Sequence, residues 1–318
     1  MTPIRRHGWE IPESEVTPEA AVLRRRTVLG AAATGLGAAA GLALGAGAAR
    51  AGALPAMDPP RNMTYRAGRA LTVEKAATTY NNYYEFSQDK DLWRAAQKMT
   101  IAPWSIRIEG LVTKPRTLGL DDLLAQVSLQ ERVYRHRCVE AWAMTVPWTG
   151  FPMADLVRLA DPLGSAKYVT FTTIEEPKSM PGLDSPLFPF PYLEGVTMAE
   201  AMNPLAFISV GLFGKPLPKQ NGAPIRITLP WKYGFKSGKA FVKVTFTDTM
   251  PKTFWAQISP SEYGFWANVN PAVPHPRWSQ ATERLIGTDQ RVPTQIFNGY
   301  GPFVASLYAG MKGDILYR

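Results

Sequence analysis

A single cysteine, Cys138, constrains this 318-residue chain more than any other feature of its sequence. One thiol cannot form an internal disulfide, so packing or a bound cofactor must stabilise the fold. It also excludes a c-type haem, which needs two cysteines, and an iron–sulfur cluster, which generally needs several. The only histidines are His7, His136 and His275, which are too few to complete a conventional structural zinc site.

Three side chains that are or can become cationic, Arg135, His136 and Arg137, directly precede this cysteine. Positive charge close to sulfur lowers the pKa of a thiol and favours the thiolate that binds metals. Cys138 is therefore a candidate metal ligand. The alternative is a buried cysteine that acts as a small hydrophobic side chain, since free cysteine is among the most buried residue types. The spacing alone leaves both interpretations open.

The N-terminus has the pattern of a twin-arginine export signal. Arg24-Arg25-Arg26 precedes about two dozen uncharged residues that end at Ala49-Arg50-Ala51, a small-x-small cleavage site. An uncleaved membrane anchor is the alternative, because the length of the segment just permits it. The segment is only weakly apolar, since Gly and Ala dominate it, and this favours the twin-arginine route. We therefore predict a signal peptide over 1–51 and export of the folded protein to the periplasm.

Charge and composition limit the partners and the domain organisation. The formal net charge is +9 at pH 7, but no dense run of lysine and arginine occurs, so nucleic acid is not an expected partner. Residues 52–71 are rich in Pro, Gly and Arg and predict an extended N-terminal arm. Residues 72–318 are long enough to form one catalytic domain with a single large core.

Hydrophobic periodicity predicts strands that alternate with short helices and long loops. Strand patterns cover 104–112, 133–138, 168–174, 206–213, 225–229 and 241–247. Helical spacing covers 118–127 and 153–160, and Pro147 to Gly150 predicts a turn. This order of elements indicates an α+β fold with a mixed β-sheet core rather than a doubly wound sheet.

The strand pattern at 133–138 also predicts where the side chains beside the cysteine point. Successive residues of a strand face opposite sides. Tyr134, His136 and Cys138 are therefore expected on one face, and Arg135 and Arg137 on the other.

The segment Pro218 to Lys239 is a second candidate binding region. It combines several cations with Asn-Gly, Tyr-Gly and Ser-Gly turns and contains no acidic residue; the cations are Lys219, Arg226, Lys232, Lys236 and Lys239. Cations together with exposed backbone amides suit a phosphate. A solvated basic loop is the alternative, and the absence of acidic residues makes the two equally good explanations.

Several motifs in a fixed order resemble the catalytic subunits of periplasmic protein-methionine-sulfoxide reductases. This family consists of molybdenum enzymes with the sulfite-oxidase-like, molybdopterin-binding fold. The motifs are NNYYEF at 81–86, RCVEAW at 137–142, QNGAP at 220–224, PWKYGFK at 230–236 and NGY at 298–300. The likeness extends from about Thr72 to near the C-terminus, so it covers nearly the whole of the predicted domain.

The resemblance implies a set of site residues. Molybdenum would be held by two dithiolene sulfurs of one molybdopterin and by the thiolate of Cys138, in keeping with the preference of soft ligands. Glu140 would lie near the metal as a proton donor, with Asn82 beside it. The pterin and its phosphate would be contacted by residues that match Asn81, Tyr84, Glu85, Thr173, Asn221, Arg226, Ser237, Gly238 and Lys239.

The resemblance also implies a reaction and its partners. Methionine sulfoxide in oxidised periplasmic proteins would be reduced to methionine, and the oxygen would leave as water. Because the chain has no residues for a cluster or a c-type haem, a partner must deliver the electrons, and the family implies a haem-containing membrane subunit fed by the quinone pool. Two alternatives remain: a small-molecule S- or N-oxide reductase or sulfite oxidase on the same fold, and a cofactor-free periplasmic binding protein.

Overall fold

The computed structural model describes residues 57–318. The predicted signal at 1–51 lies outside these residues. Within them, no helix is both long enough and apolar enough to cross a membrane. The part of the predicted arm that is described, 57–71, has no helix or ladder strand and packs on the domain. Its Tyr65 ring lies 6.0 Å from the ring of Tyr134 and 5.3 Å from that of Phe303.

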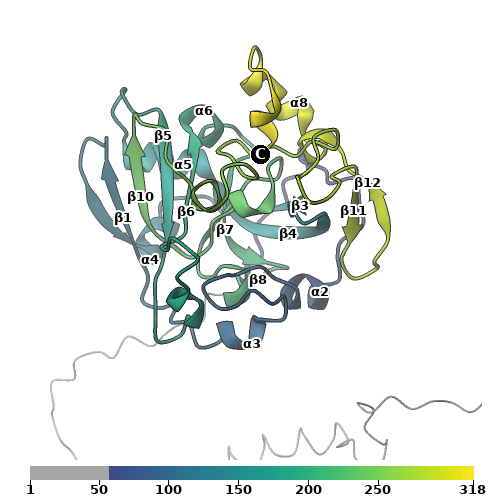
Figure 1. The fold of residues 1–318 in the computed structure, drawn as a ribbon. Coiled ribbons are helices and arrows are strands. Elements are labelled where there is room, and N and C mark those ends of the chain that lie inside the picture. Colours follow the sequence, from purple (N-terminus) through teal and green to yellow (C-terminus); the bar gives the residue numbers. More distant parts are fainter. Residues whose placement is uncertain (1–56) are drawn as a thin grey trace, which may run out of the picture. The chain divides into compact units, whose positions relative to one another are not determined.

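The first of two sheets has five strands in the order β2-β1-β10-β5-β6 (Figure 1). Strands β1 and β10 are parallel and the other pairs are antiparallel. The alternation that predicted β1 appears in its burial, because Ile106 and Ile108 are buried while Ser105 and Arg107 are exposed. The strands are β1 (Ser105–Gly110), β2 (Arg116–Gly119), β5 (Tyr168–Thr173), β6 (Leu193–Thr197) and β10 (Phe241–Thr247).

The second sheet is built on a long buried strand, β4, and lies beside the first sheet in Figure 1. Its main path is β12-β11-β4-β7-β8, while β3 pairs with β4 and β9 pairs with β7. Only β11 and β4 are parallel. Both sheets are thus mixed, which confirms the predicted α+β fold. The strands are β3 (Gln130–Arg137), β4 (Trp142–Pro152), β7 (Phe207–Leu212), β8 (Lys215–Pro216), β9 (Arg226–Thr228), β11 (Thr282–Leu285) and β12 (Arg291–Pro293).

The helices are short and lie around the sheets. The predicted helix at 153–160 is confirmed with the same bounds, and the one at 118–127 is shorter than predicted, at Leu120–Leu124. In α5 the apolar stripe that predicted the helix is buried, including Met153, Leu156 and Val157. The helices are α2 (Glu74–Thr79), α3 (Trp93–Ala96), α4 (Leu120–Leu124), α5 (Met153–Ala160), α6 (Met198–Ala201), α7 (Phe254–Ile258) and α8 (Gly301–Val304).

The predicted turn at Pro147 to Gly150 is wrong, because β4 runs through it. Pro147 is paired with Val133 of β3, but it lies outside the ladder of β4 with β7, which starts at Trp148. The register shifts between Thr149 and Gly150, which is a β-bulge. Proline and glycine therefore lie inside a continuous strand here, next to the start of its pairing with β7 and at its bulge, and not at a reversal of the chain.

Gly150→Ala is expected to lower the free energy of unfolding by about 2 kcal/mol, within the range for overpacking a buried position. A Cβ at this position would collide with the carbonyl oxygen of Ile208 on β7. Gly164→Ala is the matched control, since a Cβ there meets no atom within 4 Å, and it should change stability by less than about 0.5 kcal/mol. Urea denaturation of both variants checks this, and equal losses would contradict it.

Candidate functional site

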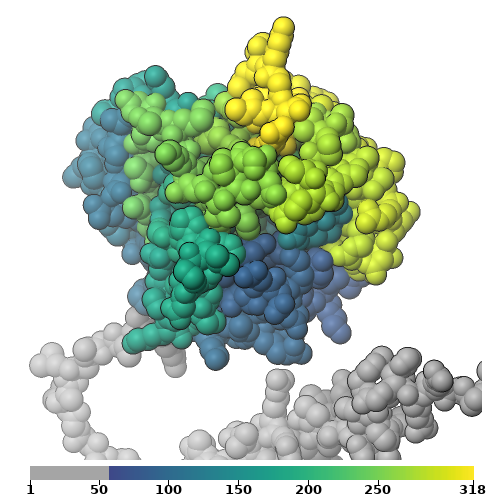
Figure 2. Space-filling view, viewed as in Figure 1, coloured from purple at the N-terminus to yellow at the C-terminus, as the bar shows by residue number. Residues whose placement is uncertain are grey.

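A cavity of about 630 Å³ lies where β3 ends, and Cys138 is in its wall. Segments that are far apart in the chain meet on this face of the molecule, as the purple, teal and yellow-green regions of Figure 2 show. The residues named from the sequence all line this one cavity: Asn81, Asn82, Tyr84, Glu85, Cys138, Glu140, Thr173, Asn221, Arg226, Ser237, Gly238 and Lys239. The structure thus brings the whole set together, while the individual roles remain predictions.

The position of Cys138 is fixed by a tight connection between β3 and β4. The Cys138 N–H donates to the carbonyl of Trp142 (2.9 Å), and the Ala141 N–H donates to the carbonyl of Cys138 (3.1 Å). The next carbonyl, that of Val139, accepts hydrogen bonds from the side chains of Trp278 and Gln280, both at 2.8 Å. The connection that carries the thiol is therefore held by its own backbone hydrogen bonds and by side chains of a distant segment.

The neighbouring cations lower the pKa of the Cys138 thiol less than burial raises it, so the expected net lowering is wrong. Arg137 points away from the cavity and pairs with Glu283 at 2.8 Å, with both side chains fully buried. Arg135 points the same way and donates to Gln295 (2.6 Å). Burial, followed by the negative charge of Glu140, raises the pKa of Cys138 to about 12. The strand alternation that separates the two faces also keeps the guanidinium groups away from the sulfur.

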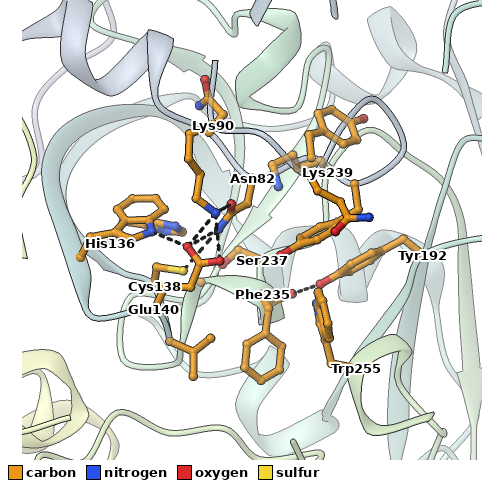
Figure 3. A pocket seen from close by; sticks show the side chains of 18 of the residues that line it. Asn82, Lys90, His136, Cys138, Glu140, Tyr192, Phe235, Ser237, Lys239 and Trp255 are labelled. Atoms are coloured by element: carbon orange, nitrogen blue, oxygen red, sulfur yellow. Dashed lines mark hydrogen bonds and ion pairs between the residues drawn. The ribbon is translucent and has the colours of Figure 1, made fainter. Parts of the chain in front are cut away.

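A hydrogen-bonded cluster surrounds the thiol (Figure 3). Lys90 Nζ contacts Glu140 Oε1 at 2.9 Å and Oε2 at 2.8 Å, and it also donates to Asn82 Oδ1. Asn82 Nδ2 lies 3.5 Å from Cys138 Sγ and 3.3 Å from Glu140 Oε2. Trp142 Nε1 donates to the same carboxylate oxygen at 3.0 Å. Asn82 therefore links the ion pair to the thiol.

The same cluster determines the protonation of Glu140. Burial alone would raise the pKa of this carboxyl, but the hydrogen bonds from Lys90, Trp142 and Asn82 outweigh burial and hold the pKa below its usual value. These contacts favour the ionised carboxylate of Glu140, and its role as a proton donor stays a prediction. Lys90, which sequence reasoning missed, is the cation in this pair. It precedes Glu140 by 50 residues in a loop without periodic pattern, so no signal pointed to it.

The cationic segment at 218–239 divides into two groups. Lys232 pairs with Glu200 and Lys236 with Glu194, each at 2.5 Å and fully buried. The carboxylates come from α6 and β6, which supply the acidic partners that the segment itself lacks. Neither of these two lysines lines the cavity. The interpretation of the whole segment as a phosphate cradle or as a solvated loop is therefore wrong for both lysines.

Arg226 and Lys239 form the second group and do line the cavity. Within residues 57–318 neither forms an ion pair. Arg226 donates to the carbonyls of Asn221 (2.8 Å) and Ser237 (3.1 Å). Burial lowers the pKa of Arg226 to about 10, and burial together with Arg226 lowers that of Lys239 to about 7. Two buried basic side chains that form no ion pair within the described residues are the chemistry expected of a phosphate site.

Other groups in the wall fit a polar ring system. The side-chain oxygens of Asn81 and Asn221 are buried and have no hydrogen-bond partner among the described residues, so each is available to accept from a ring N–H. Glu85 is buried in the same wall, and burial raises its pKa to about 7. Unpaired cations, free amide oxygens and a thiol in one cavity are together a donor set that fits molybdopterin and a metal.

Aromatic side chains line the rest of the cavity, and sequence reasoning assigned only Tyr84 among them to the site. The ring of Tyr84 lies edge-on to Trp255 at 5.0 Å and to Phe188 at 5.4 Å. Trp278, stacked on His275 at 3.7 Å, is also in the wall. His136 lines the cavity too, and burial lowers its pKa well below the usual value, so the ring is neutral. The cavity thus combines a charged end with an apolar wall.

The comparisons with known proteins agree with this chemistry. A family model described as an oxidoreductase molybdopterin binding domain matches residues 94–255. The protein-methionine-sulfoxide reductase catalytic subunit MsrP of Burkholderia mallei is 49% identical over 313 residues, which are 96% of this chain and 95% of that protein. The MsrP subunits of Ralstonia nicotianae and Xanthomonas campestris pv. campestris are 48% and 46% identical, each over 96% of this chain and over 95% and 97% of their own length. Among solved structures, the sulfane dehydrogenase SoxCD of Paracoccus pantotrophus aligns over 59% of this chain and 46% of that chain, at 14% identity and a TM-score of 0.46.

Proposed function

This chain belongs to the family of protein-methionine-sulfoxide reductase catalytic subunits, and we propose that it repairs oxidised proteins in the periplasm with electrons from a haem-containing membrane subunit. It is a molybdenum-dependent oxidoreductase that reduces methionine sulfoxide to methionine. The observation that carries the proposal is the cavity that joins the Cys138 thiol to two unpaired cations. Because the family is enzymatic, a cofactor-free binding protein is no longer an alternative.

Each group in the cavity has a place in holding the cofactor. Arg226 and Lys239 would bind the phosphate, and the amide oxygens of Asn81 and Asn221 would accept hydrogen bonds from the pterin. The Cys138 thiolate would ligate the metal. Tyr84, Glu85, Thr173, Ser237 and Gly238 complete the wall. When bound, the molybdenum centre supplies the two-electron oxygen-transfer chemistry.

The surrounding side chains would orient the substrate and balance charge. Asn82 donates to Cys138 Sγ and so fixes the sulfur toward the cavity. The aromatic wall of Tyr84, Trp255 and Trp278 suits the methyl and thioether groups of a methionine side chain, since sulfur packs favourably on aromatic rings. Reduction of a sulfoxide consumes two electrons and two protons and yields a thioether and water. The ion pair of Lys90 and Glu140 lies in the wall of the same cavity.

The location and the electron route rest on the sequence. We assign 1–51 to a twin-arginine signal, 52–71 to an arm and 72–318 to the catalytic domain. A folded protein that carries a cofactor suits this export route. Since one cysteine cannot hold an iron–sulfur cluster or a c-type haem, each turnover draws two electrons from a partner. A haem-containing membrane subunit fed by the quinone pool fits a periplasmic reductase of this family.

The test is purification from the periplasm of a host that makes molybdopterin. We expect an equimolar content of molybdenum, and turnover of methionine sulfoxide in an oxidised protein with a reduced viologen dye as electron donor. With quinol as the donor, turnover should require membranes that contain the haem subunit. High turnover on sulfite, or on small S-oxides only, would instead favour the alternative molybdoenzymes. Folded protein without molybdenum would contradict the proposal.

A further inference from the structure

We propose that Lys90 is a further catalytic residue, whose ammonium group donates a hydrogen bond to the sulfoxide oxygen of the bound substrate. This inference rests on the proposed function and names a residue that recognises the oxygen to be removed. It begins with the position of Lys90 in the wall of the cavity, on the loop that precedes α3. The side chain is 28% exposed, so it is anchored in the wall and still accessible from the cavity.

The number of donors on Lys90 supports the proposal. An ammonium group has three N–H donors and no acceptor. Within the described residues, Asn82 Oδ1 takes one of these donors. The two oxygens of the Glu140 carboxylate, at 2.9 and 2.8 Å from Nζ, belong to one group and can share a second donor. The third donor is then available to a ligand in the cavity.

The other members of the hydrogen-bonded cluster around the thiol cannot take this role. Asn82 Nδ2 already donates to Cys138 Sγ and Glu140, and Trp142 Nε1 donates to Glu140. The carboxylate of Glu140 accepts hydrogen bonds only, and it would repel the partial negative charge on a sulfoxide oxygen. Within this cluster, Lys90 is thus the group with both an available N–H donor and a positive charge.

The geometry places Lys90 within reach of a substrate at the metal-binding position. The two ends of one amide group, that of Asn82, contact Lys90 Nζ and Cys138 Sγ. A sulfoxide held beside the sulfur is therefore also beside the ammonium group. Figure 3 shows Lys90, Asn82, Glu140 and Cys138 converging on the same part of the cavity.

The chemistry of the substrate gives this contact a consequence. A sulfoxide oxygen is a strong hydrogen-bond acceptor, and the thioether product has lost it. A donor on Lys90 therefore binds substrate more tightly than product, which selects the oxidised side chain and lets the reduced one leave. Lys90 would thus let the enzyme discriminate between methionine sulfoxide and methionine, whereas the aromatic wall would contact both side chains.

The experiment compares Lys90→Met with Lys90→Arg in the molybdenum-loaded enzyme. The readouts are molybdenum content, tryptophan-fluorescence titration with a methionine-sulfone peptide and with the matching methionine peptide, and kcat/KM on an oxidised protein. The sulfone keeps an oxygen acceptor but is not the substrate. Lys98→Met is the matched control, because Lys98 is an exposed lysine outside the cavity.

For Lys90→Met we expect about 10- to 100-fold weaker sulfone-peptide binding, the loss of one hydrogen bond to a charged group. Binding of the methionine peptide and molybdenum content should not change. kcat/KM should fall by a similar factor, Lys90→Arg should recover part of both losses, and Lys98→Met should match the parent.

Three results would overturn the assignment. Equal weakening for both peptides would mean that Lys90 only shapes the cavity. Loss of molybdenum in both Lys90 variants would make it a cofactor-binding residue. Unchanged sulfone-peptide binding would show that Lys90 does not contact the oxygen. A parent enzyme that reduces no protein-bound methionine sulfoxide would count against the proposed function instead, so the two failures are distinguishable.

Discussion

Cys138→Ser is expected to lose methionine sulfoxide reduction by at least about 1,000-fold, beyond the 10- to 100-fold typical of groups that only support a metal ligand. A hydroxyl is a harder and far less acidic ligand than a thiol, so it does not replace a soft thiolate on molybdenum. The fold should survive, because serine nearly matches cysteine in size and the connection from β3 to β4 is held by backbone hydrogen bonds. Most of the pterin should also stay, since its proposed anchors lie elsewhere in the wall.

The measurement pairs activity with molybdenum content, pterin content and thermal unfolding of the same preparation. Ala160→Ser is the control, because it also places a hydroxyl at a buried position but lies on α5, outside the cavity. It should keep the full activity. Activity within about 10-fold of the parent in Cys138→Ser would show that the thiolate is not needed as a ligand.

Lys239→Met is expected to change two properties in opposite directions. Cofactor affinity should fall by about 10- to 100-fold, because a hydrogen bond to a charged group contributes about 1.5–3 kcal/mol. Without cofactor, the variant should be more stable than the parent. Burial and the nearby Arg226 disfavour the charged lysine, which is why its pKa is lowered to about 7. Removing that cation relieves its repulsion with Arg226 in the cofactor-free protein. In the loaded protein, the same cation would bind the phosphate.

Lys236→Met is the matched control and should behave in the reverse way. Lys236 neutralises Glu194 in the core, so its loss leaves a buried carboxylate unpaired and should cost about 3–5 kcal/mol. The affinity of the remaining folded protein for cofactor should be unchanged. Urea unfolding of cofactor-free protein and pterin retention during dialysis measure both effects. Destabilisation of cofactor-free Lys239→Met would contradict the assignment of Lys239 as a cation held for a ligand.

Local patterns in the sequence predicted those features that depend on local chemistry. The bounds of α5 and β10 agree with the predicted ranges, because helical spacing and strand alternation are properties of consecutive residues. The face of Cys138 was also predictable by alternation. Pro147 and Gly150 were misread, since the same two residue types mark a turn or the irregularities of a buried strand.

Features that depend on packing between distant segments were not predictable. Lys232 and Lys236 were interpreted as part of a phosphate cradle or a solvated basic loop, but they pair with Glu200 on α6 and Glu194 on β6, which are distant in the sequence. Lys90 lies in an irregular loop, and its contact with Glu140 depends on how that loop folds over β3 and β4. The resemblance to a family assembled the residue set, whereas the charge state of each member had to come from the structure.

The alternation of β3 has a consequence for how the length of this strand can vary. An insertion or deletion of one residue at 130–134 of β3, before Arg135, would move every later side chain of the strand to the opposite face. Arg135 and Arg137 would then turn toward the cavity, and the thiol of Cys138 would turn toward Glu283. A substitution in β3 alters the contacts of one side chain. A change in the length of the strand moves the side chains of both faces to the opposite side. The number of residues in this strand therefore matters more to the chemistry than the identity of most of them.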